Sequence, residues 1–229
     1  MMIYLLISGT IAISGMMMIG LTLLFRSEYG TKNRIRDGKH GSAAAKKFTS
    51  NAVVNSIFSL STVYGLTYLL APYLYHEGTT SIFRVIWEGV AILLVYDFFY
   101  YLVHRYPFHK WRILRGVHAV HHVVRNPSAI DSLYLHPLET FLGLALLWAC
   151  TGLVAVIAGP VSVYSFGWTF LVYSTLNVVV HSGLKMRIFP ASIATYLATR
   201  HDKHHANMKA KNFASVTPLW DYLLGTREA

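Results

Sequence analysis

Uncharged apolar runs alternate with polar stretches along most of this chain. The first run, residues 3–25, contains no charged residue, and a helix that rises about 1.5 Å per residue crosses a hydrocarbon core of roughly 30 Å over that length. Further apolar runs follow at about 51–75, 82–103, 138–158 and 161–180. The pattern predicts an all-α integral membrane protein in which an extra N-terminal transmembrane helix precedes a four-helix transmembrane bundle.

The ends of these runs have simple explanations. The first run lacks a preceding basic segment and is long for the apolar part of a signal peptide, so we expect a retained helix. The Gly159–Pro160 pair separates the fourth run from the fifth, because proline interrupts a helix. The last 48 residues are polar with short apolar pieces, and we expect helices on or beside the membrane there.

Composition supports this class and gives an orientation. The chain has 229 residues, of which 54% are hydrophobic and 13% charged, whereas soluble domains carry about 25% charged residues. Of its 20 Lys and Arg residues, 19 fall in the stretches 26–50, 104–136 and 182–229, and only Arg84 lies elsewhere. The positive-inside rule therefore predicts that these three stretches are cytoplasmic. It also accounts for the net charge of +10 without nucleic acid binding.

The cysteine count limits the chemistry. Cys150 is the one cysteine, and it lies in an apolar run. A disulfide framework, a cysteine-type zinc site and a cysteine-bound iron–sulfur cluster are therefore excluded. No phosphate-binding glycine motif indicates a nucleotide site.

Histidine is concentrated in three short boxes, "HRYPFH", "HAVHH" and "HDKHH", at residues 104–109, 118–122 and 201–205. In an HxxHH box on a helix, three imidazoles face nearly one direction. Imidazole binds zinc, copper, iron and nickel. One box can give two ligands to one metal and its third to a second metal, so two facing boxes suit a two-metal centre. An exposed basic helix face is the alternative for a single box.

The first box needs a different geometry because its histidines are five residues apart. We expect the third membrane helix to end near His104 and Pro107 to open the next helix, so that His104 and His109 come from two elements. His181 ends the fifth apolar run on the same side as the boxes. It is either a further ligand or an anchor at the membrane interface.

Other polar residues have two readings each. Asn177 could orient a metal-bound water or bond to a neighbouring helix. His136 could support the metal site or simply start a helix beside Pro137. Asp97 shares one helix stripe with Tyr101 and His104, so its carboxylate could accept the second N–H of a liganding histidine, directly or through water, or it could bond between helices. Tyr101 is a further candidate to support the metal site. His40 and His76 are expected to be ordinary surface residues.

The boxes occur together with "DFFYYLV", "LRGVHAVHH", "LHPLE", "HSG" and "NFASVTPLWDYLLGT". This set resembles the fatty acid hydroxylase/sterol desaturase superfamily over about residues 90–226. The family pattern is HX3–4H, HXXHH, a histidine near the end of a later membrane helix, a final HXXHH and a WDxLFGT-like ending. Some members that act on fatty acyl groups have a histidine where this chain has Asn177, so one metal could lack a ligand that water or Asn177 supplies.

The resemblance implies a non-haem centre of two iron ions on the cytosolic face that uses O2 to hydroxylate or desaturate a lipid drawn from the bilayer. It implies no catalytic residue beyond the metal centre. The metal ligands that it implies are His104, His109, His118, His121, His122, His181, His201, His204 and His205.

Several expectations complete this hypothesis. Residues 1–48 form the N-terminal helix and basic cytosolic loop, and residues 49–229 form the catalytic domain. No motif indicates bound haem or flavin, so electrons must come from a separate ferredoxin- or cytochrome-b5-like donor. The basic cytoplasmic face, with Lys110, Arg112, Arg115 and Arg125, could dock this acidic donor, or could reflect the positive-inside bias alone. A bacterial inner membrane is favoured over the endoplasmic reticulum.

Hydroxylation is favoured over desaturation with the same centre. Two other classes are alternatives. A non-catalytic metal binder or transporter would need polar residues threading several membrane helices. A zinc hydrolase would need a carboxylate base beside the metal, for which Asp202 and Glu139 are candidates.

Overall fold

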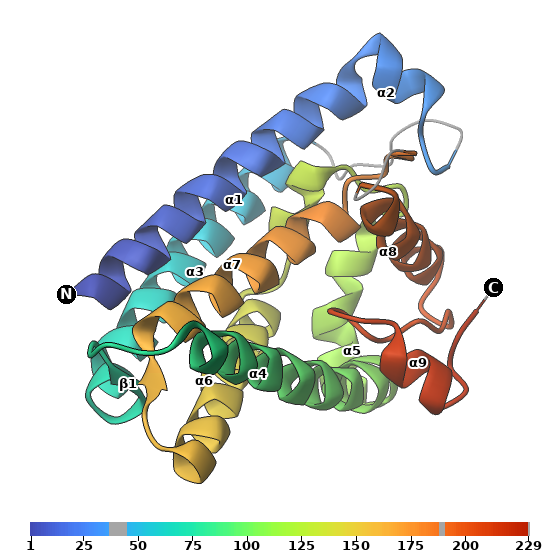
Figure 1. Cartoon of the computed structure of the whole chain (residues 1–229). Coiled ribbons are helices and arrows are strands. Elements are labelled where there is room, and N and C mark those ends of the chain that lie inside the picture. Colours follow the sequence, from blue (N-terminus) through green and yellow to red (C-terminus); the bar gives the residue numbers. More distant parts are fainter. Residues whose placement is uncertain (37–44, 188–190, 229) are drawn as a thin grey trace.

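The computed structural model describes residues 1–36, 45–187 and 191–228, and helices make up most of it (Figure 1). Its elements in chain order are α1 (Met2–Arg26), α2 (Glu28–Lys32), α3 (Ala45–Leu74), β1 (Tyr75–His76), α4 (Ile82–Val103), the π-helical turn η1 (His104–Phe108), α5 (Arg112–Ala119), the 3₁₀ turns η2 (His121–Val123) and η3 (Ala129–Leu133), α6 (Pro137–Ala158), β2 (Val161–Ser162), α7 (Val163–Val180), α8 (Ala191–His205) and α9 (Leu219–Leu223).

All five predicted apolar runs form helices, and local signals set their ends. Pro137 is the first residue of α6, where its missing N–H costs nothing. Gly159 follows α6 with φ of 84°, a conformation that glycine adopts without steric cost. The Ser81 and Ser162 hydroxyls accept the N–H groups of Arg84 and Tyr164 and so cap α4 and α7. The all-α membrane architecture expected from the sequence is therefore confirmed.

Four described helices, α1, α3, α6 and α7, are long and apolar enough to cross a membrane. The 22-residue helix α4, which contains Arg84, Glu88 and Asp97, is not among the four. It nevertheless runs between the same two ends of the molecule as they do. The predicted third span is thus a full-length helix of more polar composition.

Contacts between distant segments define the two ends. At the far end, the N-terminal ammonium lies 2.7 Å from Glu77, and β1 pairs in parallel with β2. At the histidine end, the segment after α1 forms a bridge from Arg34 to Leu184, just beyond α7. Helix α4 starts at the far end and finishes among the histidines. His76 lies in β1 at the far end, and the expectation for His40 falls outside the described residues.

The core lies where α1, α4, α6 and α7 meet. Its largest fully buried side chains include Tyr96, Leu147, Trp148 and Phe166. Apolar residues on the outer faces of the same helices are exposed, for example Leu23 and Val156. Apolar side chains that face outward along membrane-length helices match contact with lipid.

Gly89 marks the closest approach of α4 to α7. A Cβ at this position would collide with the Trp168 ring and lie 2.7 Å from the Thr169 hydroxyl. The Trp168 indole N–H donates to the Val85 carbonyl at 2.9 Å, which fixes the ring over this site. The absent side chain is therefore what allows the two helices to pack together.

Replacing Gly89 with alanine should destabilise the fold by about 1–3 kcal/mol, because the added methyl group overpacks this contact. The measurement is thermal unfolding in detergent. Gly65→Ala is the matched control, since an added Cβ meets nothing within 4 Å there and alanine is the better helix former. Equal unfolding temperatures for the two variants would contradict the packing argument.

Candidate metal centre

A π-helical turn brings the two histidines of the first box together. Helix α4 ends at Val103 and continues directly into η1, which contains Pro107. A π-helix bonds residues five apart and so places them on nearly one face. The rings of His104 and His109 lie 5.1 Å apart. The expectation that Pro107 opens the next helix is wrong, because the chain winds through Pro107 and α5 starts only at Arg112.

The other boxes lie on neighbouring elements. The box at 118–122 runs from the last turn of α5 into η2, and the box at 201–205 forms the last turn of α8. His181 caps the C-terminus of α7. The structure therefore collects histidines from five helical segments at one end of the molecule.

These side chains form two groups in which potential ligand atoms lie within 4.8 Å of one another. The five-histidine group consists of His104, His109, His118, His122 and His204. The four-histidine group consists of His121, His181, His201 and His205. All nine predicted ligands are thus brought together, and each HxxHH box is divided between the groups.

The Nδ1 atoms of seven imidazoles face hydrogen-bond acceptors. Six of these acceptors are backbone carbonyls, and the seventh is the Glu139 carboxylate, 2.7 Å from His118. The carbonyl pairs are His104–Phe213, His109–Met208, His121–Tyr134, His181–Asn177, His204–Lys211 and His205–Val124, at 2.7–3.3 Å. Because a carbonyl oxygen only accepts, these Nδ1 atoms carry the proton and each Nε2 presents a lone pair.

The Nε2 atoms converge within each group. His104 and His118 approach to 3.0 Å, and His121 and His181 approach to 3.1 Å. Each of these four has its Nδ1 on an acceptor, so each contact places two lone pairs against one another. Such a contact is repulsive unless a cation lies between the nitrogens. The donor set and its orientation therefore fit metal ions.

Burial keeps the imidazoles neutral, as metal ligands must be. It lowers the pKa of His118 and His121 to about 3 and the pKa of His109 and His181 to about 4. Burial also lowers the pKa of the remaining five, with further lowering from neighbouring imidazoles. Because these imidazoles bind a proton weakly, a proton shared between two facing Nε2 atoms would stabilise the contact poorly compared with a metal ion.

The spacing of the nitrogens favours one kind of geometry. With metal–nitrogen bonds of about 2.1 Å, ligands at right angles lie about 3.0 Å apart, whereas tetrahedral ligands lie about 3.4 Å apart. Where two Nε2 atoms of one group approach to hydrogen-bonding distance, they lie 2.9–3.3 Å apart. Five donors also exceed a tetrahedral set. The five-histidine group therefore suits an ion with more than four positions better than tetrahedral zinc.

Asp97 and Tyr101 do not contact the histidine nitrogens as the sequence suggested. The Asp97 carboxylate accepts the backbone N–H groups of residues 215–217 and the Thr217 hydroxyl. The Tyr101 hydroxyl lies 2.9 Å from the Thr226 hydroxyl and accepts from Arg105 at 2.6 Å. The direct hydrogen bond between Asp97 and a histidine is not formed, because residues 215–217 take up its carboxylate oxygens.

The side chains of His136 and Asn177 both bond to the backbone of their own helices. His136 caps α6 by accepting the Leu138 N–H on Nδ1 at 3.1 Å, which is the helix-start alternative. The Asn177 side chain donates to the Tyr173 carbonyl of its own helix at 2.8 Å, rather than to a neighbouring helix. Its backbone carbonyl accepts from His181 at 2.7 Å. Asn177 therefore orients a histidine through its main chain.

Glu139 is the residue that sequence reasoning missed as a partner of the histidines. Its Oε1 atom faces His118, while its Oε2 atom is buried without a partner among the described residues. A glutamate three residues after His136 in "LHPLE" was the available signal. The supporting carbonyls had no sequence signal, because every residue has one.

Two cavities share part of their lining near the histidines, and of the two only the small one has histidines in its wall. A small one of 70 Å³ is bordered by His104, His121, His181 and His201. A larger one of 360 Å³ extends between α1, α3, α6 and α7 and is mostly lined by apolar residues. The two cavities adjoin one another, because five residues line both of them: Tyr100, Ser132, Leu135, Glu139 and Asn177.

The charged residues of α4 and α8 do not support the alternative classes. Arg84 and Glu88 pair at 2.6 Å at the far end, and Asp97 binds main chain, so they form no file of polar groups across the membrane. Asp202 faces Arg36 at 2.8 Å, away from the metal groups. Glu139 is engaged with His118. Asp202 is therefore held by Arg36 rather than placed as a hydrolytic base, whereas the Oε2 atom of Glu139 has no partner among the described residues and Glu139 lines the small cavity.

The fold and the site together define a helical membrane protein with a buried centre of nine histidines. A family model described as fatty acid hydroxylase matches residues 89–226, which is more than half of the chain. The chain therefore belongs to the fatty acid hydroxylase family, and the resemblance inferred from the histidine boxes is confirmed.

The relatives to which this chain is similar carry names that indicate different reactions. The chain is 32% identical over 148 residues to methylsterol monooxygenase 1 of Rattus norvegicus, covering 60% of this chain and 45% of the relative. It is 29% identical to fatty acid hydroxylase vlmA of Lecanicillium sp (61% and 43%) and 34% identical to very-long-chain aldehyde decarbonylase GL1-9 of Oryza sativa subsp. indica (61% and 54%). The chain spans about half the length of these relatives. No solved structure matches it significantly.

The lowered histidine pKa values predict that the metal-free protein loses stability in mild acid. An unfolded histidine titrates near about 6.5, whereas His109 and His181 titrate at about 4 in the fold. Between these values the unfolded state binds more protons, so stability falls as pH drops below about 6.5, by up to about 1.4 kcal/mol per pH unit for each such histidine. Unfolding temperatures of chelator-treated protein from pH 7.5 to 5.5 measure this. A flat profile would contradict it.

Proposed function

We propose that this protein is a membrane-bound non-haem di-iron oxidoreductase that uses O2 to hydroxylate a C–H bond of a lipid. The observation that carries this is the convergence of nine imidazoles, seven of them oriented through Nδ1, into two groups beside a small cavity that adjoins a larger apolar one. Membership of the fatty acid hydroxylase family and the oxygenases among its relatives support it. Desaturation at the same centre is the alternative reaction.

The proposed ligands are the five-histidine group for one iron and the four-histidine group for the other. Iron bound there would supply the O2 chemistry that no amino-acid side chain provides. The chain's own contribution is to hold the imidazoles neutral, to fix the Nδ1 protons of seven of them on carbonyls and Glu139, and to exclude water by burial. The catalytic domain proposed for residues 49–229 contains all nine ligands.

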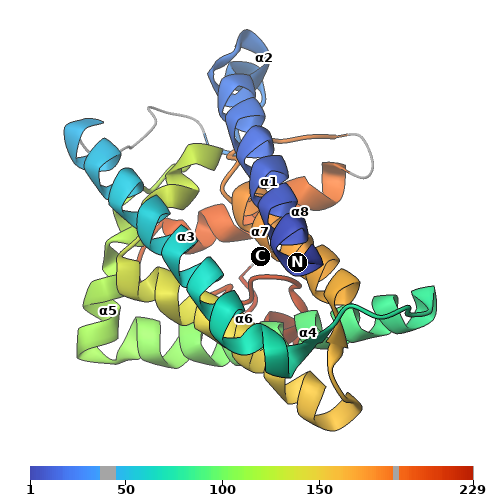
Figure 2. The same cartoon turned by 90° about the vertical axis from the view of Figure 1, so that its left-hand side faces the viewer.

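A lipid reaches this site from the bilayer in our proposal. Helices α1 and α3 are joined toward the far end by the Ser8–Tyr64 hydrogen bond of 2.8 Å and spread apart toward the histidine end (Figure 2). The larger cavity lies between them, with Gly15 on α1 and Ser59 on α3 in its wall. It adjoins the small cavity beside the histidines. A chain that slides in between α1 and α3 would thus lead to the metal groups.

Electrons and orientation complete the proposal. Inserting one oxygen atom of O2 and releasing the other as water consumes two electrons, which a separate ferredoxin- or cytochrome-b5-like protein would deliver. Exposed Lys110, Arg112 and Arg115 lie on or next to α5, whose buried face carries His118, and could receive an acidic donor there. The basic stretches favour a cytoplasmic histidine end, and we favour a bacterial inner membrane.

The function is tested by comparing the lipids of cells with and without the chain, together with metal analysis of the purified protein. We expect about two irons per chain and a lipid that has gained one oxygen atom. A loss of two hydrogens would indicate desaturation instead. His121→Ala and His204→Ala should each abolish the product and weaken one metal, because each removes a donor from a different group. His76→Ala, at the far end, should change neither. Active protein with one metal or none would contradict the di-iron proposal.

The path of the lipid is tested by filling the larger cavity. An added Cβ at Gly15 meets nothing within 4 Å, so Gly15→Phe should fold and project its ring into the cavity. We expect kcat/KM for the lipid to fall about tenfold or more, while iron content stays unchanged. Gly20→Phe is the matched control, since this exposed position of α1 is equally open but does not line the cavity. Equal activity of both variants would rule out this path.

A further inference from the structure

The C-terminal segment (residues 206–228) packs directly on the five-histidine group. Its backbone supplies three of the acceptors that fix Nδ1 protons in that group. The pairs are Met208 with His109 at 3.1 Å, Lys211 with His204 at 2.9 Å and Phe213 with His104 at 2.7 Å. The four-histidine group takes its carbonyls from elsewhere, namely from Val124, Tyr134 and Asn177. The two groups are therefore supported by different parts of the chain.

A strained turn aims two of these carbonyls. Asn212 lies between Lys211 and Phe213 and has φ of 63°, in the left-handed region that most residues avoid. Its side chain holds this conformation: Oδ1 accepts from Arg200 at 2.6 Å and from the Glu228 N–H at 3.0 Å. Such strain persists only where surrounding contacts impose it.

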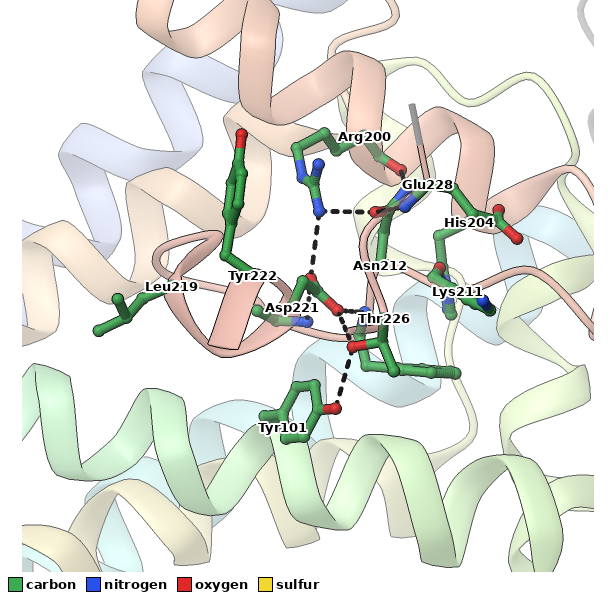
Figure 3. Close-up of polar contacts among 12 residues, drawn as sticks. Tyr101, Arg200, His204, Lys211, Asn212, Leu219, Asp221, Tyr222, Thr226 and Glu228 are labelled. Carbon is green, nitrogen blue, oxygen red and sulfur yellow. Dashed lines mark hydrogen bonds and ion pairs between the residues drawn. The ribbon is translucent and has the colours of Figure 1, made fainter. Parts of the chain in front are cut away.

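Asp221 lies beside this turn and binds the two residues that follow Asn212 (Figure 3). Its carboxylate accepts the Phe213 N–H at 2.9 Å, the Ala214 N–H at 3.1 Å and the Thr226 hydroxyl at 2.8 Å. Arg200 lies 3.5 Å away on the same side. The side chain is 1% exposed. The carboxylate thus ties both N–H groups that follow Asn212 to the start of α9 (Leu219–Leu223).

We propose that Asp221 is a positioning residue for the metal of the five-histidine group alone. This inference rests on the proposed metal-binding role of the two groups. Loss of the carboxylate frees the Phe213 and Ala214 N–H groups, and the turn at Asn212 then relaxes. The carbonyls of Lys211 and Phe213 move away from His204 and His104. Those two imidazoles lose their fixed tautomer and orientation, while the supports of the four-histidine group are untouched.

The variant Asp221→Asn keeps the size of the side chain but replaces one accepting oxygen with a donor. We expect the affinity of one of the two metal sites to fall about 10- to 100-fold, the usual effect of losing a support behind a metal ligand, and the other site to keep its affinity. The measurement is titration of the full-length protein in detergent with Fe(II) under anaerobic conditions. Mn(II) loading followed by electron paramagnetic resonance gives a second readout, because a single remaining ion lacks the coupling of a pair.

Glu88→Gln is the matched control. Glu88 is also a fully buried carboxylate, and it accepts the Ser162 N–H and the Ser165 hydroxyl at the far end. This variant should lose stability and keep both metals. Thr226→Val is a milder variant that removes one hydrogen bond to Asp221. It should weaken the same metal site by a smaller factor, and it provides the test if Asp221→Asn does not fold.

The outcomes separate this inference from the proposed function. Two unchanged sites in Asp221→Asn and Thr226→Val, or equal weakening of both sites, would overturn the positioning role while leaving the di-iron proposal intact. Selective loss of one metal, in a protein that oxidises no lipid, would support the positioning role and contradict the proposed function. A wild-type protein that holds no metal would overturn both.

Discussion

The structure depends on a requirement that the histidine nitrogens impose. Pairs of imidazoles whose Nδ1 atoms donate to acceptors must face one another with lone pairs about 3 Å apart, and only cations make that favourable. The acceptors must therefore be held firmly while the Nε2 atoms converge. Backbone carbonyls without helix partners serve this purpose, and they occur where helices end. The site accordingly lies at the ends of α4, α5, α7 and α8 rather than midway along any of them.

This requirement also explains the irregular elements. A straight α-helix through residues 104–109 would turn His109 away from His104 by about 140°. The π-helical turn at η1 removes that difference, and the two rings lie 5.1 Å apart. The positive φ of Asn212 similarly turns the carbonyls of Lys211 and Phe213 toward different histidines. Backbone distortions therefore occur where a ligand or its acceptor must be aimed, as expected for strain kept at functional sites.

Much of this could be predicted from the sequence, because apolar length and histidine spacing are local signals. They gave the five helices, the common end of the boxes and the nine residues that gather there. The roles of Asp97 and Tyr101 could not be predicted in this way. The stripe of α4 that carries Asp97 and Tyr101 does face the site. Residues 215–217 and Thr226 lie against this stripe and form hydrogen bonds with the Asp97 carboxylate and the Tyr101 hydroxyl. Only the tertiary arrangement shows that a segment more than 100 residues later is placed there.

The division of the boxes follows from helix geometry. At about 100° per residue, positions i and i+4 lie about 40° apart, while i+3 lies about 60° to the other side of i. His201 and His205, on α8, accordingly share the four-histidine group, and His204 joins the other. The box at 118–122 passes from α5 into the 3₁₀ turn η2 and divides in the same way, with His118 and His122 in the five-histidine group and His121 in the four-histidine group. Each group thus receives two nitrogens from one box and one from the other. The first box adds two nitrogens to the five-histidine group, whereas His181 adds a single nitrogen to the four-histidine group.

The four-histidine group is the one that borders the small cavity most, through His121, His181 and His201, with Asn177 beside them. In the proposed reaction, that is the side from which O2 and the lipid carbon would reach the site.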